Sequence, residues 1–162
     1  MGLDMYLYVN KYVSRMNYDR SPDGELTTSI QPVFQAITEA LGTDTLIRQD
    51  DWTGYSVEVP VGYWRKANAI HGWIVNNCAN GVDECQRIYV PREKAQELVN
   101  LCKRVLANPN EAEVLLPPQS GFFFGTYEID GWYLDALQDT IDIFEPLLIS
   151  DDADAIYYQA SW

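Results

Sequence analysis

The spacing of apolar residues changes along this chain, and that change restricts the fold more than any other feature of the sequence. Apolar and polar side chains alternate over residues 3–9, which is the period of a half-buried strand. Over residues 92–106 the apolar side chains recur every three or four positions, which indicates an amphipathic helix. The same two patterns predict further helices over residues 31–41, 63–79 and 130–145, and further strands over residues 53–61, 87–90, 121–125 and 155–162. Asp130 is the predicted N-cap of the last of these helices.

These helices and short strands do not follow the regular strand–helix–strand order that builds a parallel sheet. We therefore predict a single α+β domain over residues 1–162, in which three to four helices pack on a small, mainly antiparallel sheet. Hydrophobic residues make up 47% of the chain. A chain of this length and composition can bury a core of its own.

The N-terminus and the cysteines predict a cytoplasmic protein with reduced thiols. Asp4 falls where a signal peptide is most apolar, and no apolar run approaches the roughly 18 residues that a membrane-spanning helix needs. The cysteines, Cys78, Cys85 and Cys102, are three in number and lack the closely spaced pairs of a structural zinc site. The glycine-flanked segment 121–125 lacks the spacing of a phosphate-binding loop. We expect no metal ion, no cofactor and no membrane association.

The acidity of the chain is concentrated at its C-terminal end. The net charge of the whole chain is -13, and residues 111–162 carry eleven acidic side chains and no basic one. This balance disfavours direct binding to nucleic acid, because phosphate contacts need clustered Lys and Arg. It suits a protein partner that presents a basic surface.

Four acidic residues of the predicted helix over residues 130–145 form the candidate interaction surface. Asp135, Asp139 and Asp142 are separated by four and three residues, so they share the helix face opposite the apolar stripe, and Glu145 extends the row. One interpretation is a solvated face that keeps the protein in solution. The other is an array of carboxylates that binds a basic groove on a partner.

A second candidate site combines aromatic, cationic and amide side chains, namely Tyr63, Arg65, Asn68, His71 and Trp73. Arg65 could hold an anionic ligand against an aromatic wall formed by Tyr63 or Trp73. His71 is the only histidine and could act as a general acid or base. The structural alternative is that His71 is a buried, hydrogen-bonded core residue and that Arg65 pairs with a carboxylate.

Four segments of the chain are distinctive. They read MGLDMYLYV at residues 1–9, YWRKANAIHGW at 63–73, QSGFFFG at 119–125 and YYQASW at 157–162. Together they resemble a family of small uncharacterised proteins from bacteria and tailed phages. The resemblance implies a cytoplasmic setting and a phage or mobile-element origin, and it supplies no functional residues. For a small acidic protein of that kind, interference with a host enzyme or defence factor is a reasonable expectation.

Two hypotheses about function follow. In the first, the protein is a non-catalytic interaction protein that binds a basic protein surface through its acidic C-terminal third. In the second, it is a small enzyme or anionic-ligand-binding domain with a cleft around Tyr63, Arg65, Asn68, His71 and Trp73. We favour the first, because the chain contains no recognisable catalytic, metal-binding or nucleotide-binding motif.

Overall fold

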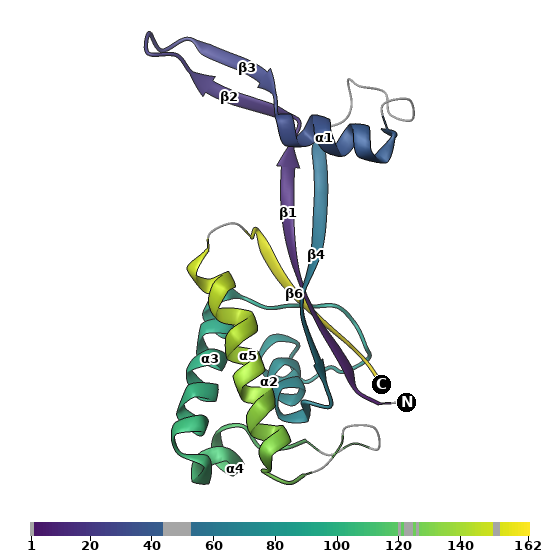
Figure 1. The fold of residues 1–162 in the computed structure, drawn as a ribbon, viewed down its shortest axis with the longest axis vertical. Coiled ribbons are helices and arrows are strands. Elements are labelled where there is room, and N and C mark those ends of the chain that lie inside the picture. Colours follow the sequence, from purple (N-terminus) through teal and green to yellow (C-terminus); the bar gives the residue numbers. More distant parts are fainter. Residues whose placement is uncertain (1, 44–52, 120, 122–124, 126, 151–152) are drawn as a thin grey trace. The chain divides into compact units, whose positions relative to one another are not determined.

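The structure, a computed structural model, describes residues 2–43, 53–119, 121, 125, 127–150 and 153–162 (Figure 1). Contacts along the chain divide it into two compact units. The large unit contains Met1–Asn10 and Glu58–Trp162, and the small unit contains Lys11–Val57. Two long strands, β1 and β4, each contribute residues to both units.

The described helices and strands occur in the following order along the chain: β1 (Asp4–Ser14), β2 (Met16–Arg20), β3 (Leu26–Ile30), α1 (Pro32–Leu41), β4 (Gly54–Arg65), α2 (Asn68–Cys78), β5 (Ile88–Tyr89), α3 (Arg92–Ala107), the 3₁₀ turn η2 (Pro109–Glu111), α4 (Ala112–Leu115), α5 (Gly131–Ile149) and β6 (Ala155–Ser161). No helix among these residues is both long enough and apolar enough to cross a bilayer.

The main sheet has four strands in the order β4-β1-β6-β5. β1 pairs with β6 and β6 pairs with β5, both in antiparallel register. β4 also runs antiparallel to β1, because the N–H of Lys66 donates to the carbonyl of Leu3 at one end and the N–H of Arg15 donates to the carbonyl of Thr53 at the other. The predicted α+β class, with helices packed on a mainly antiparallel sheet, is confirmed.

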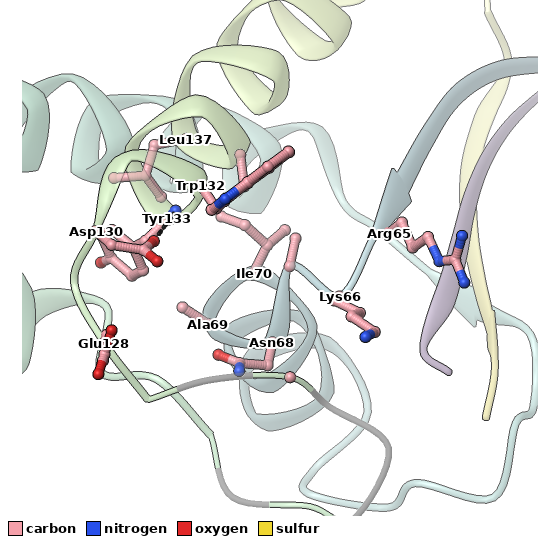
Figure 2. Close-up of a pocket in the computed structure, with 13 residues that line it drawn as sticks. Arg65, Lys66, Asn68, Ala69, Ile70, Glu128, Asp130, Trp132, Tyr133 and Leu137 are labelled. Carbon is pink, nitrogen blue, oxygen red and sulfur yellow. Dashed lines mark hydrogen bonds between the residues drawn. The ribbon is translucent and has the colours of Figure 1, made fainter. Parts of the chain in front are cut away.

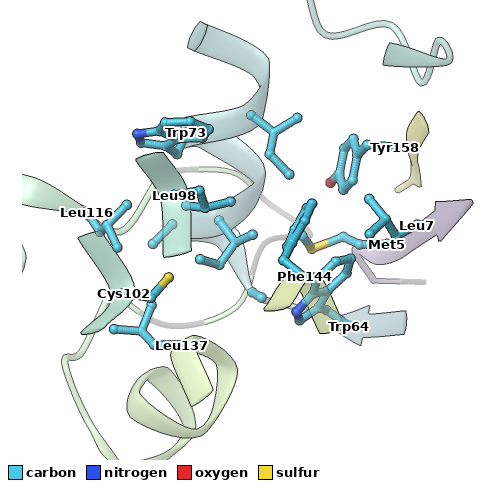
Figure 3. Close-up of a cluster of buried hydrophobic side chains, with 14 of the residues drawn as sticks. Met5, Leu7, Trp64, Trp73, Leu98, Cys102, Leu116, Leu137, Phe144 and Tyr158 are labelled. Atoms are coloured by element: carbon cyan, nitrogen blue, oxygen red, sulfur yellow. The ribbon is translucent and has the colours of Figure 1, made fainter. Parts of the chain in front are cut away.

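The core of the large unit lies between the sheet and the helices α2, α3 and α5, which gather on one side of the strands in Figure 1. Figure 3 shows Met5 and Leu7 of β1 pointing toward Phe144 of α5 and Trp64 of β4. The Trp64 indole N–H donates to the hydroxyl of Thr140 at 3.0 Å, so the one polar atom of this ring is satisfied inside the core. Met5 and Leu7 of β1 are buried here and Val9 is partly buried, so the predicted alternation is observed most clearly at the first two of these residues.

The small unit contains the residues of β1 and β4 between Lys11 and Val57, the β2–β3 hairpin and α1. Gly24 has a φ of 84° in the hairpin turn, a backbone conformation that glycine adopts at little cost. The buried cluster of the unit consists of Val13, Phe34 and Tyr55, and the rings of Phe34 and Tyr55 lie 4.8 Å apart. The hydroxyl of Tyr55 hydrogen-bonds to the hydroxyls of Thr38 and Thr43.

The prediction of a helix over residues 63–79 is wrong at its N-terminal end. Tyr63, Trp64 and Arg65 belong to β4, and α2 begins only at Asn68. The strand continues because its backbone still pairs with β1 as far as Lys66. A helical period in the side chains cannot reveal such pairing, since the partner strand lies about 60 residues away in the sequence.

Two other boundaries also differ from the prediction. No helix is predicted over residues 108–118, but the structure has η2 and α4 there. α5 continues past Pro146 to Ile149, because the N–H of Ser150 closes the last turn on the carbonyl of Pro146 and the leucines at 147 and 148 pack against the core. The predicted strand over residues 121–125 has its three phenylalanines outside the described residues.

Candidate interaction surface

The N-terminal end of α5 is fixed by two polar contacts. The carboxylate of Asp130 accepts from the N–H of Tyr133 at 3.0 Å, which is the N-cap that the sequence predicts. The hydroxyl of Tyr133 donates to the carbonyl of Leu116 at 2.8 Å. Between these anchored residues, Trp132 projects outward and is 82% exposed. An indole that is so exposed is costly to leave in water and is typical of a contact site.

The outward face of α5 carries the predicted row of carboxylates. Because Leu137, Ile141 and Phe144 are buried, the side chains of Asp135, Asp139 and Asp142 are left on the exposed face. The predicted exposure of these three residues is thus observed, and Glu145 is only partly exposed.

The four acidic residues of the row differ in their partners. Glu145 forms an ion pair with Lys103 of α3, so it joins two helices. Asp142 accepts a hydrogen bond from the side-chain amide of Gln138 at 2.9 Å. Within the described part of the chain, Asp135 and Asp139 have neither a hydrogen bond to their side chains nor an ion pair. Two full negative charges are therefore available to a ligand.

Asp135 and Asp139 line a hollow of about 480 Å³, which we call the acidic hollow. Its other walls include Tyr63 and Arg65 of β4 and the indole of Trp132. Aromatic rings beside carboxylates provide both an apolar wall and a counter-charge, which is the combination that a long cationic side chain requires.

A second hollow, of about 430 Å³, shares Arg65 and Trp132 with the first. Figure 2 shows Lys66 on the β4 side of this hollow, Asp130 and Glu128 on the opposite side, and Trp132 above the first turn of α2. The guanidinium of Arg65 extends outward from the end of β4. Opposite charges thus line opposite walls of the second hollow.

The structure brings together only part of the predicted cleft. Tyr63 and Arg65 line the acidic hollow, and Arg65 and Asn68 line the second hollow. The hydroxyl of Tyr63 donates to the carboxylate of Asp4 at 2.6 Å, and this hydrogen bond raises the pKa of Tyr63. Asn68 is buried and its side-chain oxygen accepts from the N–H of Gln119. His71 and Trp73 line neither hollow.

His71 is 2% exposed and lies in a buried hydrogen-bonded row. Its Nδ1 is 2.7 Å from the hydroxyl of Tyr158, and its Nε2 is 2.9 Å from the carboxylate of Asp83. Burial, together with the nearby charge of Asp83, raises the pKa of Tyr158 well above its ordinary value. The surroundings of His71 match the structural interpretation of this residue, because both ring nitrogens are occupied by protein groups.

Trp73 is likewise a core residue. It is 9% exposed and packs within the main core of the large unit, with the ammonium of Lys94 6.0 Å from the centre of its ring. No described carboxylate lies within ion-pair distance of Arg65, so the structural alternative of an Arg65 ion pair is not observed.

The thiols and acidic residues show no arrangement typical of a metal site. Burial raises the pKa of Cys78 to about 11 and that of Cys102 to about 12, so both thiols are protonated at neutral pH. Over the described ranges, no group of three or more His, Cys, Asp and Glu side chains is placed so that it could hold a metal ion.

Trp132, which the sequence patterns did not single out, lines both hollows. The signal was present, because residues 132, 135 and 139 are separated by three and four positions and so share one face of α5. No known family, curated protein or solved structure matches the chain. The resemblance to phage proteins therefore stays a prediction, and function is inferred from the surface itself.

Proposed function

We propose that this protein is a non-catalytic interaction protein that binds a basic protein surface through the acidic face of α5. The observation that carries the proposal is the placement of Asp135 and Asp139, exposed and without partners among the described residues, in one hollow with the exposed indole of Trp132. The resemblance to phage proteins suggests the type of partner. For a protein of phage or mobile-element origin, the partner would be a host enzyme or defence factor.

The chemistry of the acidic hollow suits a Lys or Arg side chain of the partner. The aliphatic stem would lie against the rings of Trp132 and Tyr63, and the charged end would meet Asp135 and Asp139. Arg65 lines the same hollow, so a partner segment in which a carboxylate lies near the basic residue would satisfy both signs of charge. The remaining acidity of residues 111–162 would increase the association rate with a basic partner.

The proposal is tested by reversing the two free charges. The double variant Asp135→Lys/Asp139→Lys is compared with Glu93→Lys/Glu113→Lys, which changes the net charge equally at exposed positions outside the hollow. Tagged proteins capture partners from host lysate at low and high salt. The partner that wild type retains at low salt and releases at high salt is then purified and titrated.

We expect the Asp135→Lys/Asp139→Lys variant to keep its fold and to bind the purified partner at least about 100-fold more weakly, whereas the control variant loses less than about tenfold. Trp132→Ala should weaken binding by a similar factor without changing its salt dependence. Equal losses in the two double variants, or the absence of any salt-sensitive partner, would remove the proposal.

The second hypothesis, an anionic-ligand site, is favoured by one observation. The large unit contains seven Lys and Arg residues, and five of them bind carboxylates or backbone carbonyls: Arg87, Arg92, Lys94, Lys103 and Arg104. Arg65 and Lys66 have no ion pair with any described carboxylate, and both line the second hollow. A thermal-shift screen with nucleotides, phosphate and carboxylates, repeated on Arg65→Glu/Lys66→Glu, tests this alternative.

A further inference from the structure

The face of the main sheet that points away from the helices carries five tyrosines. They come from all four strands: Tyr63 from β4, Tyr6 and Tyr8 from β1, Tyr157 from β6 and Tyr89 from β5. In the register of the sheet, Tyr8 lies opposite Tyr157, and Tyr157 lies opposite Tyr89. The five residues therefore form one row across the whole sheet, which we call the tyrosine face.

Strand alternation determines the direction of these side chains. On β1 the buried residues Met5 and Leu7 face the helices, so Tyr6 and Tyr8, which follow them, face the other way. On β6 the same alternation buries residues 156, 158 and 160. Tyr6, Tyr63 and Tyr89 are 37%, 50% and 52% exposed, and Tyr8 and Tyr157 between them are partly exposed.

Neighbouring rings pack against each other within each half of the row. The ring centres of Tyr63 and Tyr6 are 5.3 Å apart, those of Tyr6 and Tyr8 are 6.3 Å apart, and those of Tyr157 and Tyr89 are 5.8 Å apart. The guanidinium of Arg87 lies 4.1 Å from the ring centre of Tyr157 and 5.6 Å from that of Tyr8, and thereby bridges the two halves of the row. Rigid aromatic rings around an arginine are typical of the centre of a protein interface.

The tyrosine face is also locally neutral. Arg87 forms an ion pair with Glu58, Asp4 accepts the hydrogen bond of Tyr63, and Arg65 lies on β4 beyond Tyr63. Two cations and two carboxylates sum to zero, whereas the whole chain carries -13. The face is thus a region where another strongly acidic molecule can approach without local repulsion.

The hydroxyl groups of the face have free hydrogen-bonding capacity. Those of Tyr6, Tyr8, Tyr89 and Tyr157 have no hydrogen-bond partner within the described ranges. A phenol can both donate and accept, so two such surfaces can satisfy each other.

We propose that the tyrosine face binds a second copy of this chain in a twofold dimer. A twofold interface joins the same patch on both subunits, so the patch must complement itself in charge, in hydrogen bonding and in shape. The tyrosine face meets the first two requirements by the balance of its charges and by its phenol groups, and its position on a sheet allows the two sheets to stack face to face. The tyrosine face shares Tyr63 and Arg65 with the acidic hollow, but its other four tyrosines do not line that hollow, and Asp135 and Asp139 lie on α5.

Single-stranded nucleic acid is a less suitable occupant of the same face. Aromatic platforms that stack bases lie in positively charged grooves that follow the phosphate backbone. Here Arg87 is already paired with Glu58, and the surrounding chain is strongly acidic. The same experiment includes nucleic acid as an outcome.

Sedimentation equilibrium of the full chain tests the proposal, at concentrations up to about 1 mM. We expect a monomer–dimer equilibrium that shifts toward the dimer as salt is raised, because salt screens the repulsion between two chains of charge -13. Tyr6→Ala and Tyr89→Ala, at two exposed positions of the row, should each raise the dissociation constant at least about tenfold. Tyr18→Ala, at a more exposed tyrosine of the small unit, should leave the dissociation constant unchanged. Circular dichroism checks that each variant is folded.

Three outcomes would overturn the proposal. The chain could stay monomeric at every concentration and salt, or it could dimerise with the same constant in the Tyr6 and Tyr89 variants. A labelled single-stranded oligonucleotide could also bind to wild type, be released by salt and fail to bind Tyr6→Ala, which would assign the face to nucleic acid. The dimer should strengthen with salt and should not be weakened by Asp135→Lys/Asp139→Lys, whereas capture of a basic partner should be weakened by both, so each proposal can fail without the other.

Discussion

The two compact units of this chain bury very different amounts of apolar material. Among the described residues, the main core of the large unit joins 25 buried residues from the sheet and its helices, whereas the buried cluster of the small unit joins three. Among the described residues of the small unit, Tyr18 and Leu41 are 64% and 63% exposed. Because stability grows with the apolar surface that is buried, the large unit should fold on its own and the small unit should be much less stable.

The largest effect should come from removing a ring at the centre of the large unit. Phe144→Ala deletes a fully buried side chain that packs 6.1 Å from the ring of Trp64, and should lower the free energy of unfolding by about 3 to 5 kcal/mol. Ile149→Ala, on the same helix and 87% exposed, should change it by less than about 0.5 kcal/mol. Urea unfolding followed by circular dichroism measures both. Equal effects would mean that the core of the large unit is not where this structure places it.

The second prediction concerns the small unit alone. Phe34→Ala removes the ring that contacts Tyr55, and with it a third of the buried cluster. Amide hydrogen exchange should show loss of protection over α1 and the β2–β3 hairpin, and unchanged protection in α3 and α5. If protection fell equally in both units, they would unfold as one cooperative structure and the contrast between them would disappear.

A smaller effect is expected for the buried polar row of the large unit. His71→Leu leaves the hydroxyl of Tyr158 and the carboxylate of Asp83 without their histidine partner, and should cost about 1 to 3 kcal/mol of unfolding free energy. Asn76→Leu, at an exposed position on the same helix, is the matched control. Binding of the basic partner should survive in both variants. Loss of binding in His71→Leu alone, with the fold intact, would instead make His71 part of the site.

The smallest effect should be a loss of stability of the large unit at alkaline pH, caused by its buried cysteines. All three cysteines of the chain belong to this unit. Burial raises the pKa of Cys102 to about 12, while the thiol of an unfolded chain titrates near 8.5. Above about pH 8.5 the unfolded chain releases the proton of this thiol and the folded chain keeps it, so the unfolding free energy falls as pH rises. Below that pH the thiol is protonated in both states and does not affect the unfolding free energy.

For Cys102 alone the loss should be about 1 kcal/mol at pH 9.5. Unfolding curves collected between pH 7 and about pH 10 should therefore have a shallower pH dependence in Cys102→Ala than in wild type. An identical slope in the two proteins would show that this thiol is accessible in the folded state.

The elements that the sequence predicted well are those determined by a local period. α3 has its apolar residues at helical spacing and buries residues 95, 98, 99, 102 and 105 as predicted, while Leu106, also predicted to face inward, is partly buried. Asp130 was identified as an N-cap because its side chain acts on a backbone N–H only three residues away. The alternation of β1 also identified which of its residues are buried.

The functional surfaces depend on contacts between distant parts of the chain, and the sequence revealed them only in part. The acidic row on α5 was visible, but its hollow also needs Tyr63 and Arg65 of β4. The tyrosine face was not recognised, because it depends on the register between strands and not on any one strand.

The sequence by itself determined the α+β class, the helical period of α3, the N-cap of α5 and the outward direction of Asp135 and Asp139. Each of these follows from side chains within a few residues of one another. The tertiary structure decided that Arg65 ends a strand, and that His71 is held between Tyr158 and Asp83. Those outcomes depend on backbone pairing and packing between segments far apart in the chain, which no local period encodes.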